Sequence, residues 1–263
     1  MGALDDKGET VQARPGARRA QDEEDAAMPE QLPEWERLLR AAARLQGILP
    51  EATLVGGTAA AIAAGHRRSA DADHVLADLI GRFDQVLAEL ESAAGWKTAR
   101  VRRPVAIFGS LDGILTTVRN QIRSAPLETI VVTASGQRIR VPTRAEILRV
   151  KSWLIVQRNA TRDFLDVAAI AANLSDGAAL AALAPMDRLY PQEGDPGSVR
   201  HQLMRQLAMP RPFDLDTLDL AEYKGLAAAW RDWGTVTDQC RRVGTLMAAA
   251  VATQRSGWKD LKG

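Results

Sequence analysis

Two adjacent glycines stand fourteen residues ahead of two aspartates in one short stretch, LVGGTAAAIAAGHRRSADADHV, at residues 54–75. Glycine lets the backbone adopt conformations that are closed to other residues, so a short strand at 53–55 can turn sharply into the alanine-rich segment. That segment predicts a short helix, and Gly65 stands where a helix commonly ends in the left-handed conformation. A helix of this length folds the chain back, so we expect the aspartates to lie beside the glycines.

This strand, turn and helix would offer ligands for a phosphate. The start of the helix presents free N–H groups and a positive dipole end, which predicts a phosphate site at Gly56, Gly57 and Thr58. Arg67 and Ser69 lie on the return path and are assigned to the same nucleotide site, because a guanidinium grips phosphate oxygens. Gly-Gly-Thr and Asp-x-Asp are each common in plain turns and solvated strand ends, but their ordered combination favours a functional site.

The two aspartates predict a metal site beside the phosphate. Asp71 and Asp73 project from one face if the segment is extended, because strand side chains alternate. Two carboxylates on one face can hold Mg²⁺ or Mn²⁺, which bridges a nucleotide's phosphates and neutralises developing charge. We expect both to bind the metal, and one also to help deprotonate an acceptor hydroxyl. The chain lacks a Walker-type Gly-Lys-Ser/Thr and a G-x-G-x-x-G, which excludes those phosphate motifs.

Composition indicates a soluble globular protein, with 46% hydrophobic residues, 25% charged residues and a formal net charge of +1. Cys240 is the only cysteine and the three histidines are scattered, which excludes an intrachain disulfide and a Cys- or His-rich zinc site. The polar start does not resemble a signal peptide, and no apolar run reaches the length of a membrane span. We expect a cytoplasmic protein with no membrane partner.

Hydrophobic periodicity divides the chain into a tail and two regions. Residues 1–30 lack aromatics and periodic apolar positions, which predicts a disordered tail. Residues 31–143 mix helices and strands, and 144–263 hold Ala- and Leu-rich helices that begin at a capping box of Thr143 and Glu146. The elements expected before the capping box are amphipathic helices at 34–49 and 73–96, two short strands within 104–118 and a β-hairpin at 128–143.

These motifs resemble the DNA polymerase β-type nucleotidyltransferases, whose signature is Gly-Gly/Ser, roughly ten residues and then Asp-x-Asp/Glu. More narrowly, the chain is similar to the AbiEii-type abortive-infection nucleotidyltransferase toxins, including the MenT group. The resemblance covers residues 54–166 and rests on two anchors, GGT…SADADHV and EILRVKSWLIVQRNATRDFLDVAAI. It implies an α+β polymerase β-like domain (31–143) with a small mixed sheet, followed by a mostly helical domain (144–263).

A lysine on the capped helix is the next candidate residue. Lys151 lies at the edge of the apolar face, where it can reach a triphosphate as a point charge. Arg144 and Arg158 lie seven residues to either side, which predicts one basic stripe, with a solvated helix face as the ordinary alternative. The resemblance assigns the family's catalytic lysine to Lys151, which would neutralise the triphosphate together with Arg67.

The resemblance also implies a required acid early in the following helix. Asp163 and Asp166 are both candidates, and Asp163 is the better match because it directly follows Arg162. The structural alternative is that acidic residues simply favour the N-terminus of a helix through its dipole.

A departure from the pattern concerns the third carboxylate that polymerase β-type sites usually add from a later strand. The strand expected at 113–122, GILTTVRNQI, contains no Asp or Glu. Asp112 could supply the acid only if its turn folds inward, and no Asp-x-Asp follows the second Gly-Ser, at Gly109. This absence keeps a non-catalytic protein of the same fold as an alternative.

Basic residues are concentrated in one region. Residues 95–162 hold thirteen Lys or Arg against three acids, although the whole chain has a net charge of only +1. Such a surplus suits a polyanion placed beside the site, for example tRNA, and it equally suits a nucleotide together with an acidic protein. Trp96 and Trp153 could stack on bases, but core packing is the expected role of both.

The expected function is metal-dependent transfer of an NMP from an NTP to an acceptor hydroxyl, with tRNA as a candidate acceptor. By resemblance, the chain would be the toxin of a toxin–antitoxin or phage-defence system, and a cognate antitoxin would be its protein partner. The alternative from another class is a nucleotide-binding or partner-binding pseudoenzyme. A nucleic-acid-binding regulator ranks third, because no clear helix-turn-helix is present.

Overall fold

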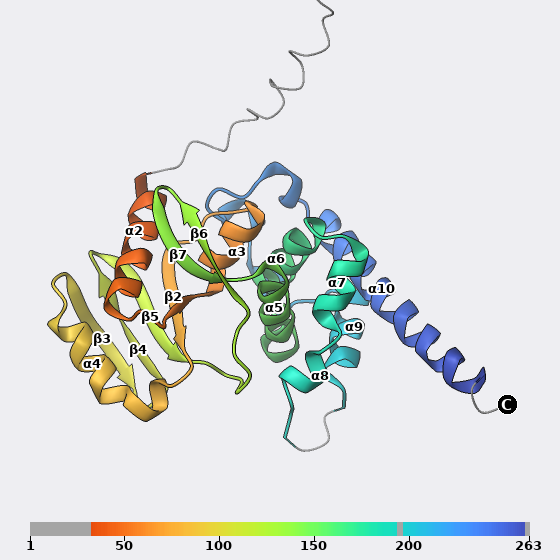
Figure 1. Ribbon diagram of the computed structural model, residues 1–263. Coiled ribbons are helices and arrows are strands. Elements are labelled where there is room, and N and C mark those ends of the chain that lie inside the picture. The colour runs from red at the N-terminus through yellow and green to blue at the C-terminus, as the bar shows by residue number, and fades with distance from the viewer. Residues whose placement is uncertain (1–32, 194–196, 261–263) are drawn as a thin grey trace, which may run out of the picture. The chain divides into compact units, whose positions relative to one another are not determined.

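A five-stranded mixed sheet forms the first layer of the computed structural model, which describes residues 33–193 and 197–260 (Figure 1). The predicted disordered tail at 1–30 lies outside the described residues. The sheet has the order β1-β2-β5-β4-β3, in which β2 and β5 are parallel and the other neighbours antiparallel. Its strands are β1 (Thr53–Leu54), β2 (Asp71–Leu76), β3 (Trp96–Arg102), β4 (Ala106–Leu111) and β5 (Ile114–Asn120).

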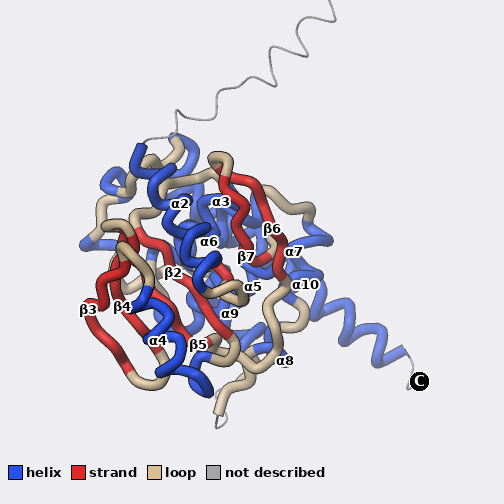
Figure 2. The backbone as a smooth tube through the Cα atoms, turned by 60° about the vertical axis from the view of Figure 1, so that its left-hand side comes forward, coloured by secondary structure: helices blue, strands red, loops and turns tan. Residues whose placement is uncertain are grey.

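Two helices cover one face of this sheet (Figures 1 and 2). They are α2 (Pro33–Ile48) and α4 (Phe83–Ser92), and the 3₁₀ turn η1 (Leu79–Arg82) precedes α4. Alternate residues of the strands, among them Leu76, Ile107 and Val118, pack against their apolar sides in a fully buried cluster. Because strand side chains alternate, the intervening residues point to the opposite face, which α2 and α4 leave uncovered.

The predicted hairpin is present as a separate two-stranded sheet. Its strands are β6 (Thr129–Ala134) and β7 (Gln137–Pro142), and a Ser-Gly turn joins them. Ile139 and Val141 of β7 are buried in a cluster with residues of α2. The hairpin therefore closes the apolar side of the first helix.

The rest of the described chain is helical, as predicted. The helices are α3 (Gly56–Ala64), α5 (Arg144–Arg158), α6 (Thr161–Ala172), α7 (Asp176–Leu183), α8 (Met186–Leu189), α9 (Val199–Ala208) and α10 (Trp233–Asp260), with short 3₁₀ turns between α9 and α10. Every residue from Asp163 to Ala171 of α6 is buried, so α6 lies at the centre of the helical core. Ala59 and Ala60 of α3 belong to the same core. The α+β class with a helical C-terminal region is confirmed; a domain boundary at residue 143 stays a prediction.

The helix predicted at 73–96 is wrong at both ends. Asp73–Leu76 belong to β2, because their alternation buries His74 and Leu76 against α2 and α4, and the helix α4 begins only at Phe83. Trp96 starts β3, which was not predicted. All residues of β3 after Trp96 are exposed, so this edge strand lacks the apolar alternation by which strands are recognised.

Candidate functional site

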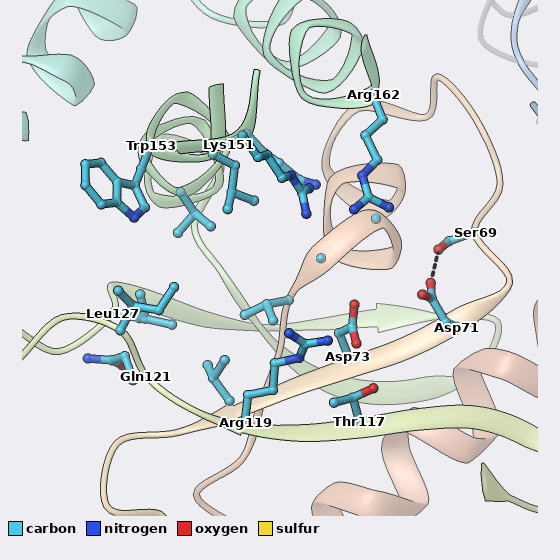
Figure 3. A pocket seen from close by; sticks show the side chains of 18 of the residues that line it. Ser69, Asp71, Asp73, Thr117, Arg119, Gln121, Leu127, Lys151, Trp153 and Arg162 are labelled. Carbon is cyan, nitrogen blue, oxygen red and sulfur yellow. Dashed lines mark hydrogen bonds between the residues drawn. The ribbon is translucent and has the colours of Figure 1, made fainter. Parts of the chain in front are cut away.

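A cavity of about 430 Å³ lies between the uncovered face of the sheet and the helices α3, α5 and α6 (Figure 3). Asp73, Thr117 and Arg119 project into it from β2 and β5, and Lys151 and Arg162 approach from α5 and α6. Seven predicted site residues line it: Gly56, Gly57, Arg67, Ser69, Asp71, Asp73 and Lys151. Segments that are a hundred residues apart in the sequence therefore share one cavity.

At both glycines, a Cβ would crowd the side chains of other site residues. Gly56 begins α3 with a φ of +70°, in the left-handed region that favours glycine. A Cβ at Gly56 would lie 2.9 Å from Oδ2 of Asp73, and a Cβ at Gly57 would lie 2.9 Å from both Nη2 of Arg67 and Oγ of Ser69. The glycine turn and the polar side chains after α3 thus come together as the spacing predicted.

The N-terminus of α3 has no side-chain cap, so its first N–H groups remain available to an anion. Thr58 is the predicted phosphate ligand that the structure does not bring to the cavity. Its side chain is buried, and its hydroxyl donates to the backbone oxygen of Asp71 at 2.6 Å. This bond ties α3 to the start of β2 and leaves only the backbone of Thr58 for a ligand.

Asp71 and Asp73 project from the same face of β2, as predicted. Asp71 is exposed and accepts a hydrogen bond from Oγ of Ser69 at 2.8 Å. Burial, and then the nearby charge of Asp71, raise the pKa of Asp73. Two close carboxylates that repel each other offer hard oxygen ligands, which fit Mg²⁺ or Mn²⁺. No group of three or more His, Cys, Asp or Glu suited to a metal occurs among the described residues.

Lys151 is buried at the cavity wall rather than free in solution. Its Nζ lies 2.7 Å from Oδ2 of Asp166 and 3.7 Å from Oδ1 of Asp163. Asp166 also accepts from Nε and Nη2 of Arg67, at 2.9 and 3.1 Å, and lies 2.8 Å from Nε2 of the buried His66. Burial by itself would raise the pKa of Asp166, but Lys151 and Arg67 outweigh it and hold that pKa well below its ordinary value. One ionised carboxylate therefore positions two cavity cations.

Asp163, the acid chosen from the sequence, faces a different partner. It is fully buried and accepts two hydrogen bonds from Arg158, at 2.6 and 2.8 Å. Its catalytic role stays a prediction, whereas Asp166 makes the close contact with Lys151. Neighbouring residues on a helix point about 100° apart, so adjacency to Arg162 does not determine which group Asp163 faces. The three-residue step from Asp163 to Asp166 was the sequence signal for both acids.

The basic stripe predicted on α5 is not an exposed surface of unpaired charges. Lys151 is buried, Arg158 pairs with Asp163, and the exposed Arg144 donates to the backbone oxygen of Ala63 at 3.2 Å. The three residues do share a side of α5, but that side packs against other helices.

The predicted capping box is half formed. Oγ1 of Thr143 accepts from the N–H of Glu146 at 3.2 Å, as expected. The carboxylate of Glu146 is buried and pairs instead with Arg123 at 2.9 Å and Arg149 at 3.0 Å. A buried carboxylate requires a cationic partner more than the helix requires a second cap.

Two exposed arginines at the cavity were missed by sequence reasoning. Arg119 of β5 and Arg162 of α6 have no hydrogen-bond or ion-pair partner within the described part of the chain, and both point into the cavity (Figure 3). Asp112 supplies no third acid, because it pairs with Arg44 at 2.5 Å and does not line the cavity. No local pattern marks either arginine; only the pairing of β5 with β2 brings Arg119 to the site.

The far end of the cavity is largely apolar. Trp153 stacks on Tyr190 with ring centroids 4.8 Å apart, and the guanidinium of Arg123 lies 5.4 Å from the centre of the Tyr190 ring. Trp153 is buried, as predicted, although it also lines the cavity together with Leu127. A flat apolar group such as a nucleobase fits this end, beside the polar end at the glycine turn.

Comparison with known proteins gives partial matches. No family model matches the chain. It is 38% identical over 128 residues to the mycolic acid-containing lipids exporter MmpL11 of Mycolicibacterium smegmatis and 36% identical over 128 residues to the heme uptake protein MmpL11 of Mycobacterium tuberculosis. Each match covers 48% of this chain but only 13% of the relative. Among the described residues, no helix combines the length and apolar character needed to span a membrane.

Partial matches among solved structures include two proteins. An antigenic nucleotidyltransferase-like protein from Paracoccidioides brasiliensis is 17% identical with a TM-score of 0.42, over 61% of this chain and 90% of that one. ANT(2″)-Ia in complex with adenylyl-2″-tobramycin is 12% identical with a TM-score of 0.45, over 58% of this chain and 97% of that one.

Proposed function

We propose that this chain is a metal-dependent nucleotidyltransferase that moves an NMP from an NTP to an acceptor hydroxyl. The observation that carries the proposal is the contact between the glycine turn and the carboxylate pair. Gly56 abuts Asp73 at the open N-terminus of α3, and Asp71 and Asp73 face the same cavity as Lys151. A phosphate bound at the glycine turn and a metal bound by the carboxylate pair would therefore adjoin within one cavity, which is what the transfer of a nucleotide requires.

The triphosphate would bind across the polar end of the cavity. The N–H groups of Gly56 and Gly57 would face its phosphates there, and Arg67, Lys151 and Arg162 would supply positive charge. Asp166 already holds Arg67 and Lys151 in place, so little reorganisation is needed as charge develops in the transition state. The protein's contribution is then mainly positioning and electrostatics, as in phosphoryl transfer generally.

The proposed transfer exchanges one bond to the α-phosphorus for another. The oxygen of the acceptor hydroxyl forms a bond to the α-phosphorus, the bond from that phosphorus to the bridging oxygen of the β-phosphate breaks, and pyrophosphate leaves with the electron pair. The hydroxyl proton passes to the carboxylate of Asp73, whose pKa burial raises above its ordinary value, so that it is a stronger base than an exposed carboxylate. A divalent cation held by Asp71 and Asp73 would supply Lewis-acid stabilisation of the phosphate charge.

The biological role within this proposal is that of a toxin in a toxin–antitoxin or phage-defence system, with a cognate antitoxin as partner and tRNA as acceptor. Its support is the sequence resemblance to AbiEii-type nucleotidyltransferases and the basic surplus at residues 95–162. Mg²⁺ or Mn²⁺ would be the metal, by the oxygen chemistry of the carboxylate pair.

A second candidate is a nucleotide-binding pseudoenzyme of the same fold. The observation that favours it is the composition of β5, whose cavity-lining residues Thr117 and Arg119 include no carboxylate. Binding of a nucleotide without transfer is the behaviour that this candidate predicts.

The two candidates are separated by a transfer assay. Purified protein is incubated with each α-phosphate-labelled NTP, Mg²⁺ and total RNA, and the RNA is examined for label. We expect label with the wild type and a loss of roughly 100-fold or more in Asp73→Asn, because the change removes a metal ligand. Asp112→Asn is the matched control, since Asp112 is a carboxylate outside the cavity.

The outcomes have distinct meanings. Equal labelling by Asp73→Asn and the wild type would exclude a role for the carboxylate pair. Nucleotide binding without labelling by the wild type would favour the pseudoenzyme.

A further inference from the structure

The strand β5 lies beside the carboxylate pair and carries no acid on its cavity side. In the parallel register with β2, Thr117 is paired with Asp73 and Arg119 is paired with Val75. Thr117 donates a hydrogen bond to Asp73. This bond lowers the pKa of the Asp73 carboxyl, but burial and the charge of Asp71 raise it by more. The place where a third carboxylate could join the pair is therefore occupied by a hydroxyl and a guanidinium.

This arrangement limits how many divalent cations the site can hold. Two-metal sites place two ions about 3.5–4 Å apart and need enough oxygen ligands to neutralise both. Here the cavity contributes two carboxylates, Asp71 and Asp73, and one of them already accepts from Ser69. A second dication would add repulsion from Arg119, which stands on the adjacent strand (Figure 3).

Arg119 is held in position without being neutralised. Its guanidinium carbon lies 5.1 Å from the centre of the Phe108 ring, and it has no hydrogen-bond or ion-pair partner among the described residues. In Figure 3 the guanidinium points toward the carboxylate of Asp73, and the positive charge of Arg119 is among the influences on the pKa of Asp73. An arginine is charged at all working pH values and its planar fork matches two phosphate oxygens.

We propose that this site holds one divalent cation with its nucleotide, and that Arg119 supplies from β5 the positive charge that a second cation would otherwise supply. The inference rests on the proposed function, because it assigns to Arg119 a contact with the triphosphate beside Asp73. On this proposal, transfer does not require a carboxylate on β5, because no second cation has to be bound. Arginines that act in this way in other phosphoryl-transfer enzymes stabilise charge on the transferred group.

The test is equilibrium dialysis of the full chain against Mn²⁺ and a labelled α,β-methylene NTP, which binds but cannot be cleaved at that bridge. Analogues with each of the four bases are tested separately. The measured quantity is the molar ratio of protein-retained Mn²⁺ to protein-retained nucleotide. We expect a ratio of one at saturation. Arg119→Gln should keep that ratio and bind the nucleotide roughly tenfold more weakly or worse, because one charged contact is lost.

Two further variants complete the design. Arg100→Gln is the matched control, because Arg100 is the other guanidinium on the Phe108 ring, at 4.4 Å, and does not line the cavity. It should bind like the wild type. Arg119→Lys keeps the charge but not the fork, so its affinity should fall between those of the wild type and Arg119→Gln.

Three results would overturn the inference. A wild-type ratio of two would show a second cation, and wild-type affinity in a folded Arg119→Gln would show that the guanidinium does not contact the nucleotide. Either result leaves the proposed transferase function standing. No retention of any of the four nucleotides by the wild type would instead overturn the proposed function, and this inference with it.

Discussion

At the residue scale, the buried pair of Lys151 and Asp166 combines a structural and a chemical role. Lys151 is buried between two carboxylates, yet it lines the cavity. Lys151→Met should lower the free energy of unfolding by about 3 kcal/mol, because breaking a buried ion pair leaves charge uncompensated. It should also reduce nucleotide transfer by roughly 100-fold, since a preorganised cation is lost from the triphosphate site.

Urea unfolding and the transfer assay measure the two effects separately, at a temperature where both proteins are folded. Lys224→Met serves as control, because Lys224 is an exposed lysine that does not line the cavity. Lys151→Arg should restore only part of the activity, since a forked guanidinium does not fit the place of a compact buried ammonium. Normal transfer by folded Lys151→Met would reduce Lys151 to a structural residue.

His74 gives a pH-dependent prediction. His74 belongs to β2, and its side chain is fully buried on the face opposite the cavity. This burial lowers the pKa of His74 from 6.5 to about 4. Between these pH values the unfolded chain takes up a proton that the folded chain does not. Stability is therefore complete above pH 6.5 and falls as the pH drops toward 4, by about 3 kcal/mol in all. Denaturant unfolding at several pH values measures this slope.

His74→Leu should flatten the slope over that interval, and the exposed His201→Leu should not. The ionisation of Asp166 does not confuse the comparison. Its pKa is lowered, so its contribution is present above the unfolded carboxyl pKa of about 3.9 and is lost only as the pH falls further. Equal slopes for His74→Leu and the wild type would mean that His74 has the same pKa in the folded chain as in the unfolded chain.

The sequence predicted residues of the cavity where the spacing is local. Gly56 and Gly57 meet Asp73 and Ser69 because a helix of nine residues returns the chain to its starting point. Arg119 could not be found in the same way, since its place depends on a parallel pairing of β5 with a strand more than forty residues earlier. Nor could the choice between Asp163 and Asp166, which depends on how α6 is rotated against α5.

At the scale of elements, the glycine turn between β1 and α3 offers a test with an internal control. Gly56 and Gly65 both have a positive φ, at +70° and +63°, at the two ends of α3. A Cβ at Gly65 meets nothing within 4 Å, whereas one at Gly56 would strike Asp73. Each change to Ala should cost about 1 kcal/mol of stability through the backbone.

Only Gly56→Ala should also weaken Mn²⁺ binding and transfer, because it displaces Asp73, the proposed metal ligand. Thermal unfolding, Mn²⁺ titration and the transfer assay on both variants make the comparison. Equal activity of the two variants would show that the close approach of Gly56 to Asp73 is not needed for Mn²⁺ binding or transfer.

Elements with strong local signals were predictable. The hairpin of β6 and β7 follows from alternation around a Ser-Gly turn, and α5 begins at its Thr143 cap. Residues 73–76 were assigned to the predicted helix at 73–96, although they belong to β2. Their alternation covers only four residues, so it was hidden by the helical periodicity of the segment that follows. The strand β3 escaped notice because an edge strand whose side chains are mostly exposed needs no apolar alternation.

At the scale of the whole molecule, the uncovered face of the sheet carries part of the basic surplus. The register of β3 shifts between Thr98 and Arg100, and this irregularity places Lys97, Arg100 and Arg102 on the face that bears Asp71. These three exposed residues, here called the sheet-face patch, form a basic margin beside the cavity. Arg103 does not belong to it, because its guanidinium lies over Phe83 and pairs with Asp84.

The sheet-face patch should bind the acceptor if the acceptor is RNA. Arg100→Glu combined with Arg102→Glu should weaken RNA binding without changing NTP affinity, because neither arginine lines the cavity. Binding of RNA by the wild type should also fall steeply as salt rises, since each phosphate contact releases counterions, and the double variant should show a shallower slope. RNA affinity at two salt concentrations, with NTP affinity measured separately, tests all three statements.

A control for the charge change is Arg205→Glu combined with Arg241→Glu, two exposed arginines on α9 and α10 that lie outside the basic region. A loss of RNA binding only in the patch variant would locate the acceptor on the sheet face, because both variants change the net charge equally. The same loss in both would indicate attraction by net charge rather than by a defined surface. RNA affinity unchanged by the patch variant, with a flat salt response, would leave a protein or a small molecule as the acceptor.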